Sequence, residues 1–348
     1  MQNEQMGFNV GIVGLGVYLP EKRMTEQDFI DAGVPKWQID EWGVYEHRVS
    51  EPEESSSEMS IRAAKDLIQK TGIDPKEIDL IIDCALVPDY IHPSNSYKIQ
   101  YEIGTVNAAA FDIAPSGGGA ATQIMLAKAL VETGEYSNVL LTCSSKFTAV
   151  ADTNDWLSVV VGGDGAAAAL ISKVGLNKGI LSSNIITLGE FYSNSGIKYK
   201  NQLNTNSRGM IYEVSNSKLL FFLNDATFIS NVEDEERKRL DDFVFKSVPL
   251  SAQMALRRTG MTYDDVDFWI THQSATGLYK HWLKSVGVST KGNYYYTNHK
   301  YGNLFMANLL VNLKEAVELS LIQDNDIIVL GGLVSGFSAG TVVIKWGK

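Results

Sequence analysis

The stretch AAAFDIAPSGGGAATQIMLAKALVETG, residues 108–134, contains the transition that decides how this chain folds. An apolar run ends at Asp112-Ile113, a Pro-Ser-Gly-Gly-Gly turn follows, and a helix-like sequence begins directly after it. A strand, a tight glycine turn and a helix N-terminus in this order are a common place to hold a nucleophile or an anion. Ser116 is the only side chain of the turn that is able to do chemistry, so it is a candidate nucleophile.

The same order of elements recurs in the second half of the chain. The segments TGIDPKEIDLIID (71–83) and TGMTYDDVDFWIT (259–271) align without a gap at Thr-Gly and at the aspartate before each apolar run. Likewise PSGGGAATQIMLAKALVE (115–132) corresponds to KYGNLFMANLLVNLKEAVE (300–318), and a strand-like run follows each of them. Both read as a glycine turn, an amphipathic helix and a buried strand. We interpret the pattern as a duplicated α/β half-domain, and chance likeness between two βαβ units is the alternative.

Short runs rich in valine, isoleucine and leucine alternate with helical segments along the chain, from NVGIVGLG near the start to GTVVIKW near the end. This alternation predicts an α/β protein whose sheets are covered by helices on both faces. A length of 348 residues fits two similar domains. We therefore place the glycine turn in a first half, residues 1–175, and the second copy in residues 176–348.

Composition and charge restrict the partners of the protein. The net charge is −11, from 41 acidic and 30 basic residues, which argues against nucleic acid and against an anionic membrane. No apolar run is long enough to span a bilayer, and the start MQNEQMGFNVGIVG lacks the regions of a signal peptide. Cys84 and Cys143 lie in apolar segments and are too few for a disulfide framework or a zinc site. We therefore expect a cytoplasmic protein without a metal or a bound cofactor.

Two polar residues of the second half are candidates for chemistry. His272 follows the apolar run DFWIT, and Asn303 follows Gly302 at the start of a helix. A structural histidine and a helix N-cap are the alternatives. If the halves pack face to face about a pseudo-twofold axis, both repeated helices begin at one pocket, with His272 beside them. A histidine and an asparagine amide at one point polarise a thioester carbonyl and stabilise an enolate, while the N–H groups of the glycine turn form an oxyanion hole.

The chain resembles the thiolase-fold condensing enzymes, and among them the β-ketoacyl-ACP synthase III type. The resemblance rests on segments in the same order: GIVGLGVYLP (11–20), W..D.WGV.E.R (37–48), EMSIRAAKDLI (58–68), FDIAPSGGG (111–119), GGDGAAAAL (162–170), THQ (271–273), YGN (301–303) and GFSAGTVVIKW (336–346). It implies two duplicated βαβαβαββ halves in a five-layer α-β-α-β-α sandwich, and a dimer. In such enzymes a cysteine takes an acyl group from coenzyme A or a carrier protein, and a histidine and an asparagine assist decarboxylation of a malonyl thioester.

The resemblance implies roles for individual residues of this chain. His272 in THQ and Asn303 in YGN match the histidine and the asparagine of the family. The position of the family's cysteine falls on Gly117, and Ser116 lies one residue earlier. The backbone N–H groups of Gly117 and Gly336 are the oxyanion candidates.

The missing cysteine leaves three hypotheses open. In the first, Ser116 is the nucleophile with His272 as its base, and the chain transfers acyl groups between acyl-CoA or acyl carrier protein and an acceptor. In the second, no covalent intermediate forms, and His272 and Asn303 bind a malonyl-type or β-keto thioester for decarboxylation or direct acyl transfer. In the third, the chain is a non-catalytic subunit that pairs with an active, cysteine-containing paralogue.

Further residues concern the substrate. Trp37 matches a family tryptophan that stacks on the CoA adenine, but Glu41 stands where the family has an arginine, and an acid beside phosphates is unfavourable. Arg48 is the basic residue proposed to compensate, and a carrier protein as donor is the alternative. His92 in YIHPSNS stands where the family has an apolar residue that reaches into the acyl pocket of the partner subunit. A loop histidine with its own hydrogen-bond partner is the alternative at that position.

Overall fold

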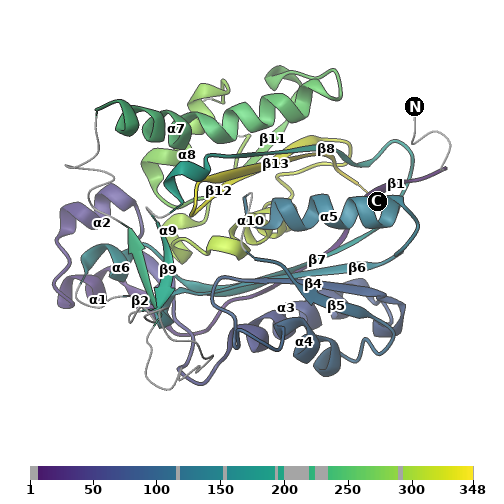
Figure 1. The fold of residues 1–348 in the computed structure, drawn as a ribbon, viewed down its shortest axis with the longest axis horizontal. Coiled ribbons are helices and arrows are strands. Elements are labelled where there is room, and N and C mark those ends of the chain that lie inside the picture. Colours follow the sequence, from purple (N-terminus) through teal and green to yellow (C-terminus); the bar gives the residue numbers. More distant parts are fainter. Residues whose placement is uncertain are drawn as a thin grey trace, which may run out of the picture.

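Two β-sheets form the framework of the molecule (Figure 1). The computed structural model describes residues 7–114, 118–151, 155–192, 195–199, 219–223, 234–288 and 293–347. The first sheet has the strand order β1-β7-β6-β4-β5, with the bounds β1 Asn9–Tyr18, β4 Leu80–Ala85, β5 Ala109–Asp112, β6 Val139–Lys146 and β7 Asp164–Val174. The second has the order β11-β12-β13-β8, with the bounds β8 Gly179–Thr187, β11 Phe268–Thr271, β12 Ile327–Val334 and β13 Ser338–Lys345.

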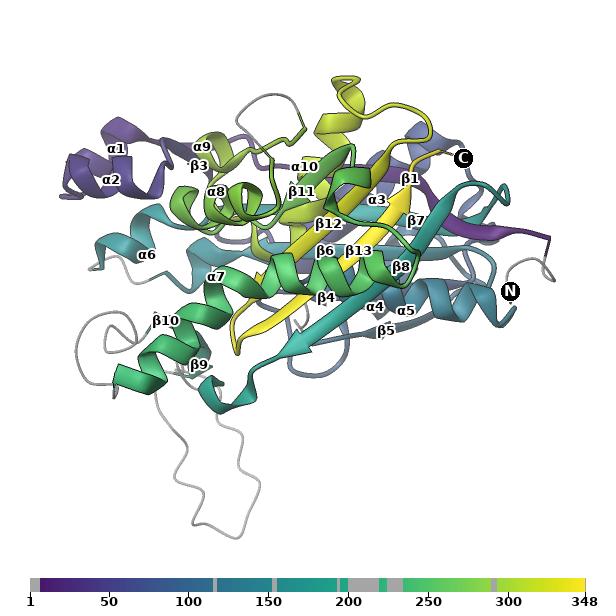
Figure 2. The same ribbon diagram turned by 90° about the horizontal axis from the view of Figure 1, so that it is seen from above.

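Helices cover both faces of each sheet (Figure 1). α3 (Ser56–Thr71) and α4 (Asn95–Ile103) pack on the outer face of the first sheet. α5 (Ala120–Glu132) and α10 (Asn308–Glu318) contact both sheets and lie between them. α7 (Asp234–Arg257) crosses the outer face of the second sheet, as Figure 2 shows, and packs beside α8 (Thr276–Ser285). The order α-β-α-β-α confirms the predicted five-layer sandwich.

The position of α5 between two sheets agrees with its composition. The helix AATQIMLAKALVE is apolar around most of its circumference, as expected for a helix that is covered on two sides. Its buried polar residue, Gln123, donates from Nε2 to the carbonyl oxygens of Ile82 (2.9 Å) and Thr142 (2.8 Å). Those hydrogen bonds compensate for the loss of water around the Nε2 group of Gln123.

The two sheets repeat one topology. The order β8-β13-β12-β11 corresponds to β1-β7-β6-β4, and in each copy the last two strands are parallel while the others are antiparallel. The two aligned aspartates accept corresponding hydrogen bonds from the backbone. Asp79 accepts from the backbone N–H groups of Ser137 (2.7 Å) and Asn138 (3.0 Å) before β6, and Asp267 accepts from that of Ile327 (2.8 Å) at the start of β12. This correspondence confirms the predicted duplication.

The connection between the halves runs from Val174 at the end of β7 to Gly179 at the start of β8. The boundary predicted between residues 175 and 176 falls in this connection. The division into two halves with that boundary stays a prediction.

Short elements gather at one end of the sandwich, on the left of Figure 1. They are β2 (Arg23–Thr25), β3 (Glu46–Arg48), α1 (Glu26–Asp31), α2 (Lys36–Trp42), α6 (Trp156–Val160) and α9 (Asn298–Tyr301). β9 (Ser195–Tyr199) and β10 (Leu219–Leu223) form a separate antiparallel pair. Among the described residues, no helix combines the length and the apolar character needed to cross a membrane.

Candidate active site

His272 and Asn303 form a hydrogen-bonded pair just after β11 and α9. His272 directly follows β11, and its backbone N–H donates to the carbonyl oxygen of Gly331 in β12 (2.8 Å). Asn303 follows α9 and Gly302, and its backbone N–H donates to the carbonyl oxygen of Val161 (2.9 Å). Nε2 of His272 lies 2.9 Å from Oδ1 of Asn303, and both side chains are buried. The structure therefore brings these two predicted site residues together.

The backbone N–H of Phe305 determines how the Asn303 amide is oriented. It donates to Oδ1 of Asn303 over 2.8 Å. Because a backbone N–H group only donates, the oxygen of the amide faces it, and the same oxygen lies beside Nε2 of His272. Nε2 must then carry a proton to bond that oxygen. The Nδ2 amino group, on the same carbon as Oδ1, is the second donor of the pair.

Phe305 reaches this position with an unusual backbone. Its φ is +43°, a conformation that costs a bulky side chain energy and that persists where neighbouring contacts enforce it. The ring of Phe305 stacks on that of buried Phe147, with centroids 4.9 Å apart and planes at 20°. The strained backbone that orients Asn303 is thus supported by packing.

Burial keeps His272 uncharged near neutral pH. The removal of the imidazole from water lowers its pKa, against the opposite effects of the hydrogen bond with Asn303 and of the Leu333 carbonyl. A neutral histidine whose Nε2 proton faces Asn303 is a hydrogen-bond donor. To act as a base at Nε2 it must first lose this proton. The geometry therefore favours the role of a donor.

Glycines let the turn before α5 approach the second sheet. Pro115, Ser116 and Gly117 lie outside the described residues, and Gly118 follows them with a φ of +81°. A Cβ at Gly118 would lie 2.9 Å from the carbonyl oxygen of Gly332. A Cβ at Gly332 would in turn lie 3.2 Å from Cβ of His272. The end of the glycine turn therefore packs against the strand that borders the histidine.

Two more of the predicted site residues are Gly336 and Arg48. Gly336 lies in the turn between β12 and β13, and its role as an oxyanion donor stays a prediction. The Arg48 guanidinium donates to the carbonyl oxygen of Pro20 (2.9 Å) and lies 5.5 Å from the ring centroid of Tyr301. These contacts give Arg48 a structural role inside the chain, and its role toward a substrate stays a prediction.

Trp37 and His92 are both exposed to solvent. Trp37 lies on α2 with 61% of its surface accessible, and Glu41 on the same helix is exposed as well. The end of α2 is tied to the second half, because the Trp42 carbonyl accepts from Oγ1 of Thr276 (3.0 Å). His92 is exposed in the loop between β4 and α4. Their substrate roles stay predictions.

Two residues near Asn303, namely His47 and Phe305, were not identified from the sequence. His47 in β3 is buried and hydrogen-bonds through Nδ1 to the carbonyl oxygen of Gly162, the residue that pairs with Asn303 in an isolated β-bridge. It lies inside the quoted motif W..D.WGV.E.R, where its position next to Arg48 was the available signal. For Phe305 no pattern of the sequence indicates its role.

Neither cysteine is suited to replace the missing nucleophile. Cys84 in β4 and Cys143 in β6 are fully buried neighbours in the first sheet. Burial raises the pKa of both thiols far above the usual range. The reactive thiolate is therefore not formed near neutral pH.

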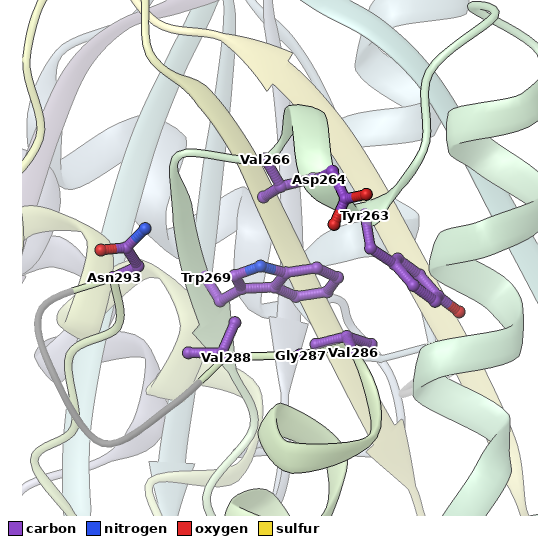
Figure 3. Close-up of a pocket in the computed structure, with 8 residues that line it drawn as sticks. All are labelled: Tyr263, Asp264, Val266, Trp269, Val286, Gly287, Val288 and Asn293. Carbon is purple, nitrogen blue, oxygen red and sulfur yellow. The ribbon is translucent and has the colours of Figure 1, made fainter.

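A separate pocket lies on the other side of β11 (Figure 3). Its volume is about 210 Å³, and it is lined by Tyr263, Asp264, Val266, Trp269, Val286, Gly287, Val288 and Asn293. Phe268 and Ile270 face the core between the sheets, whereas Trp269 packs in the outer cluster. Since side chains alternate along a strand, the pocket opens away from the face of His272.

Within the described ranges, no group of three or more His, Cys, Asp or Glu residues is placed to hold a metal ion.

Comparisons with known proteins agree with this architecture. The family model of 3-oxoacyl-[acyl-carrier-protein (ACP)] synthase III matches residues 111–189, and the model of its C-terminal part matches residues 256–346. The β-ketoacyl-[acyl-carrier-protein] synthase III of Oceanobacillus iheyensis is 30% identical over 344 residues, which cover 98% of this chain and 100% of the relative.

Solved structures show the same fold. The β-ketoacyl-[acyl carrier protein] synthase III of Thermus thermophilus has a TM-score of 0.83 at 24% identity, with 97% of this chain and 99% of that chain covered. The priming β-ketosynthase of the R1128 polyketide biosynthetic pathway has a TM-score of 0.83 at 21% identity, with 97% and 96% covered. The fold is therefore that of the thiolase superfamily. Within it, the chain belongs to the β-ketoacyl-ACP synthase III family.

Proposed function

We propose that the chain is an acyltransferase of the β-ketoacyl-ACP synthase III type that acts on acyl-CoA or acyl-carrier-protein thioesters without a nucleophilic cysteine. The relatives are named β-ketoacyl-[acyl-carrier-protein] synthase III, and one structural neighbour is the priming β-ketosynthase of a polyketide pathway, so fatty acid or polyketide biosynthesis is the proposed setting. The observation that carries the proposal is the pair of His272 and Asn303, joined over 2.9 Å. We place the reaction in the cytoplasm, where two unpaired cysteines remain reduced.

The pair of His272 and Asn303 is suited to assist the decarboxylation of a malonyl thioester. Loss of CO2 breaks the bond between the carboxylate carbon and the methylene carbon, and the electron pair moves onto the thioester oxygen as an enolate. Nδ2 of Asn303 donates to the enolate oxygen, and the N–H of His272 Nε2, which bonds Oδ1 of Asn303 in the free protein, turns to the same oxygen when the thioester binds. Both donors stabilise this negative charge more than they stabilise the neutral carbonyl. The buried surroundings strengthen these hydrogen bonds.

The enolate then has two fates. Its methylene carbon attacks the carbonyl carbon of an acyl thioester, a new carbon–carbon bond forms, and the thiolate of the donor leaves. Alternatively the methylene carbon takes a proton from water, which leaves hydroxide, and the acetyl thioester forms. Neither course needs a base at the histidine, which agrees with the protonated Nε2 of His272. For this reason we favour direct transfer or decarboxylation over an acyl-Ser116 intermediate.

A homodimer is part of the proposal. Within the described part of the chain, β5 pairs with β4 on one side and with no strand on the other. Large apolar side chains on and near α4 are exposed, among them Tyr97, Tyr101 and Val106. An open strand edge beside exposed aromatic groups favours contact with another protein surface. We infer that a second copy of this chain covers it, with His92 reaching the partner's acyl site.

The test is the release of CO2 from malonyl-CoA and from malonyl-carrier protein, with and without an acyl donor. We expect release by the unmodified protein and a loss of rate in His272→Ala and Asn303→Ala. Intact-protein mass after exposure to acyl-CoA, with Ser116→Ala as control, reports an acyl adduct. An adduct that depends on Ser116 would replace our mechanism with a serine nucleophile. If no CO2 is released and no acyl adduct forms with any donor, the proposed enzymatic activity is refuted. The remaining hypothesis is then the non-catalytic subunit.

A further inference from the structure

Glu315 of α10 accepts three hydrogen bonds from the segment that precedes Asn303. Nζ of Lys300 donates to Oε2 over 2.6 Å, the hydroxyl of Tyr295 donates to Oε2 over 2.9 Å, and the hydroxyl of Tyr301 donates to Oε1 over 2.7 Å. The side chains of Lys300 and Glu315 are only 30% and 17% exposed. Both carboxylate oxygens are thus engaged in a largely shielded cluster.

Aromatic rings complete the surroundings of the lysine. Nζ of Lys300 lies 4.8 Å from the ring centroid of Tyr301 and 5.6 Å from that of Tyr295. It also donates to the hydroxyl oxygen of Tyr295 (3.2 Å). Cation–π attraction and charge-assisted hydrogen bonds therefore hold one ammonium group in one place.

These contacts join the two helices that flank the loop carrying Asn303. Lys300 and Tyr301 are the last residues of α9, and Glu315 lies in α10, after the loop. Between them, Gly302 has a φ of +63° and Phe305 a φ of +43°. A segment with such a backbone keeps its geometry where contacts on both sides enforce it.

We propose that Glu315 is a positioning residue which, together with Lys300 and Tyr301, holds this loop so that Oδ1 of Asn303 meets Nε2 of His272. The proposal deepens the proposed function, and only its kinetic test rests on that function. Since the pair is joined at 2.9 Å, a displacement of the loop by an ångström separates the two groups.

The same helix provides a matched control. Glu318 is also an ion-paired carboxylate, with Nζ of Lys314 at 2.8 Å and Nζ of Lys70 at 3.3 Å. Its partners lie on α10 itself and on α3, so they do not touch the loop. Glu318 is more exposed than Glu315, at 49% against 17%, so Glu318→Gln controls for the loss of a charge on α10 and Tyr301→Phe tests the contact with the loop itself.

The first measurement is the NMR spectrum of the His272 imidazole, assigned as the signal that disappears in His272→Gln. Glutamine at 315 cannot accept hydrogen bonds at both ends, so we expect the His272 signals to move in Glu315→Gln and to stay in Glu318→Gln. Tyr301→Phe removes a single hydrogen bond, and it decides the question if Glu315→Gln does not fold. His272 signals that are unchanged in every folded variant of the cluster would overturn the proposal.

The second measurement is the rate of malonyl-thioester decarboxylation. We expect kcat to fall about 10- to 100-fold in Glu315→Gln while KM changes less than about twofold, because the loop positions a group that acts on the transition state. Lys300→Arg keeps the ion pair and should retain the rate that Lys300→Met loses. If the unmodified protein has no such activity, the proposed function fails, and the imidazole signals still decide the role of Glu315.

Discussion

Asp83 offers a direct test of the packing beside the candidate site. This residue of β4 is fully buried, and it accepts from Oγ1 of Thr142 (2.6 Å) and from Oγ of Ser60 (3.2 Å). Burial, with additional repulsion from Asp112 and Asp89, raises the pKa of Asp83 to about 7. Asp112 lies opposite on β5, the strand that leads into the glycine turn.

The direction of the pH effect on stability follows from the pKa of Asp83 in the folded protein and in the unfolded chain. The usual pKa of an aspartate is 3.8, so the folded protein binds the proton more tightly than the unfolded chain does. This stabilising protonation is complete below pH 3.8 and is lost as the pH rises through about 7. At 1.36 kcal/mol per pKa unit, the free energy of unfolding falls by about 4 kcal/mol across this range through Asp83 alone.

The variant Asp83→Asn removes the titration and keeps an acceptor for Thr142 and Ser60. Urea unfolding of both proteins at pH 4 and at pH 8 gives the difference in free energy of unfolding. We expect the two to be similar at pH 4 and the asparagine variant to be more stable by about 4 kcal/mol at pH 8. Thr142→Val removes a hydrogen bond that lowers the pKa of Asp83, so it should shift the transition to higher pH. A difference that does not change with pH would refute this reasoning.

Three further predictions concern the site, the turn and the dimer. Asn303→Asp exchanges the amide donor for an acceptor, so CO2 release should fall about 100- to 1,000-fold, and an unchanged rate would exclude the donor role. Gly118→Ala should lower the free energy of unfolding in urea by about 1–3 kcal/mol more than Gly134→Ala, since both have positive φ but only Gly118 is crowded. Equal losses would speak against close packing of the turn. Tyr101→Asp should give a monomer in sedimentation, whereas Tyr192→Asp, also an exposed tyrosine, should not. A dimer that survives the first change would place the interface elsewhere.

Much of the architecture can be derived from the sequence. The alternation of apolar runs and helical segments predicts an α/β fold, and the aligned segments 71–83 and 259–271 predict its duplication. Both predictions depend on local patterns, because the spacing of the apolar residues in a strand or helix indicates which of its faces is buried. The motifs THQ and YGN also identified His272 and Asn303 as residues to examine.

The chemistry of the pair was decided by the tertiary structure. The direction of the Asn303 amide depends on the N–H group of Phe305, and the state of the His272 imidazole depends on burial between two sheets. Glu315 reads in the sequence as an ordinary charged helix residue, and only the fold brings it to Lys300. Hydrogen bonds and desolvation arise between segments that are distant in the chain, so no local pattern contains them. The sequence by itself therefore determined the elements and the residue types of the site, and tertiary packing decided which atoms donate and which accept.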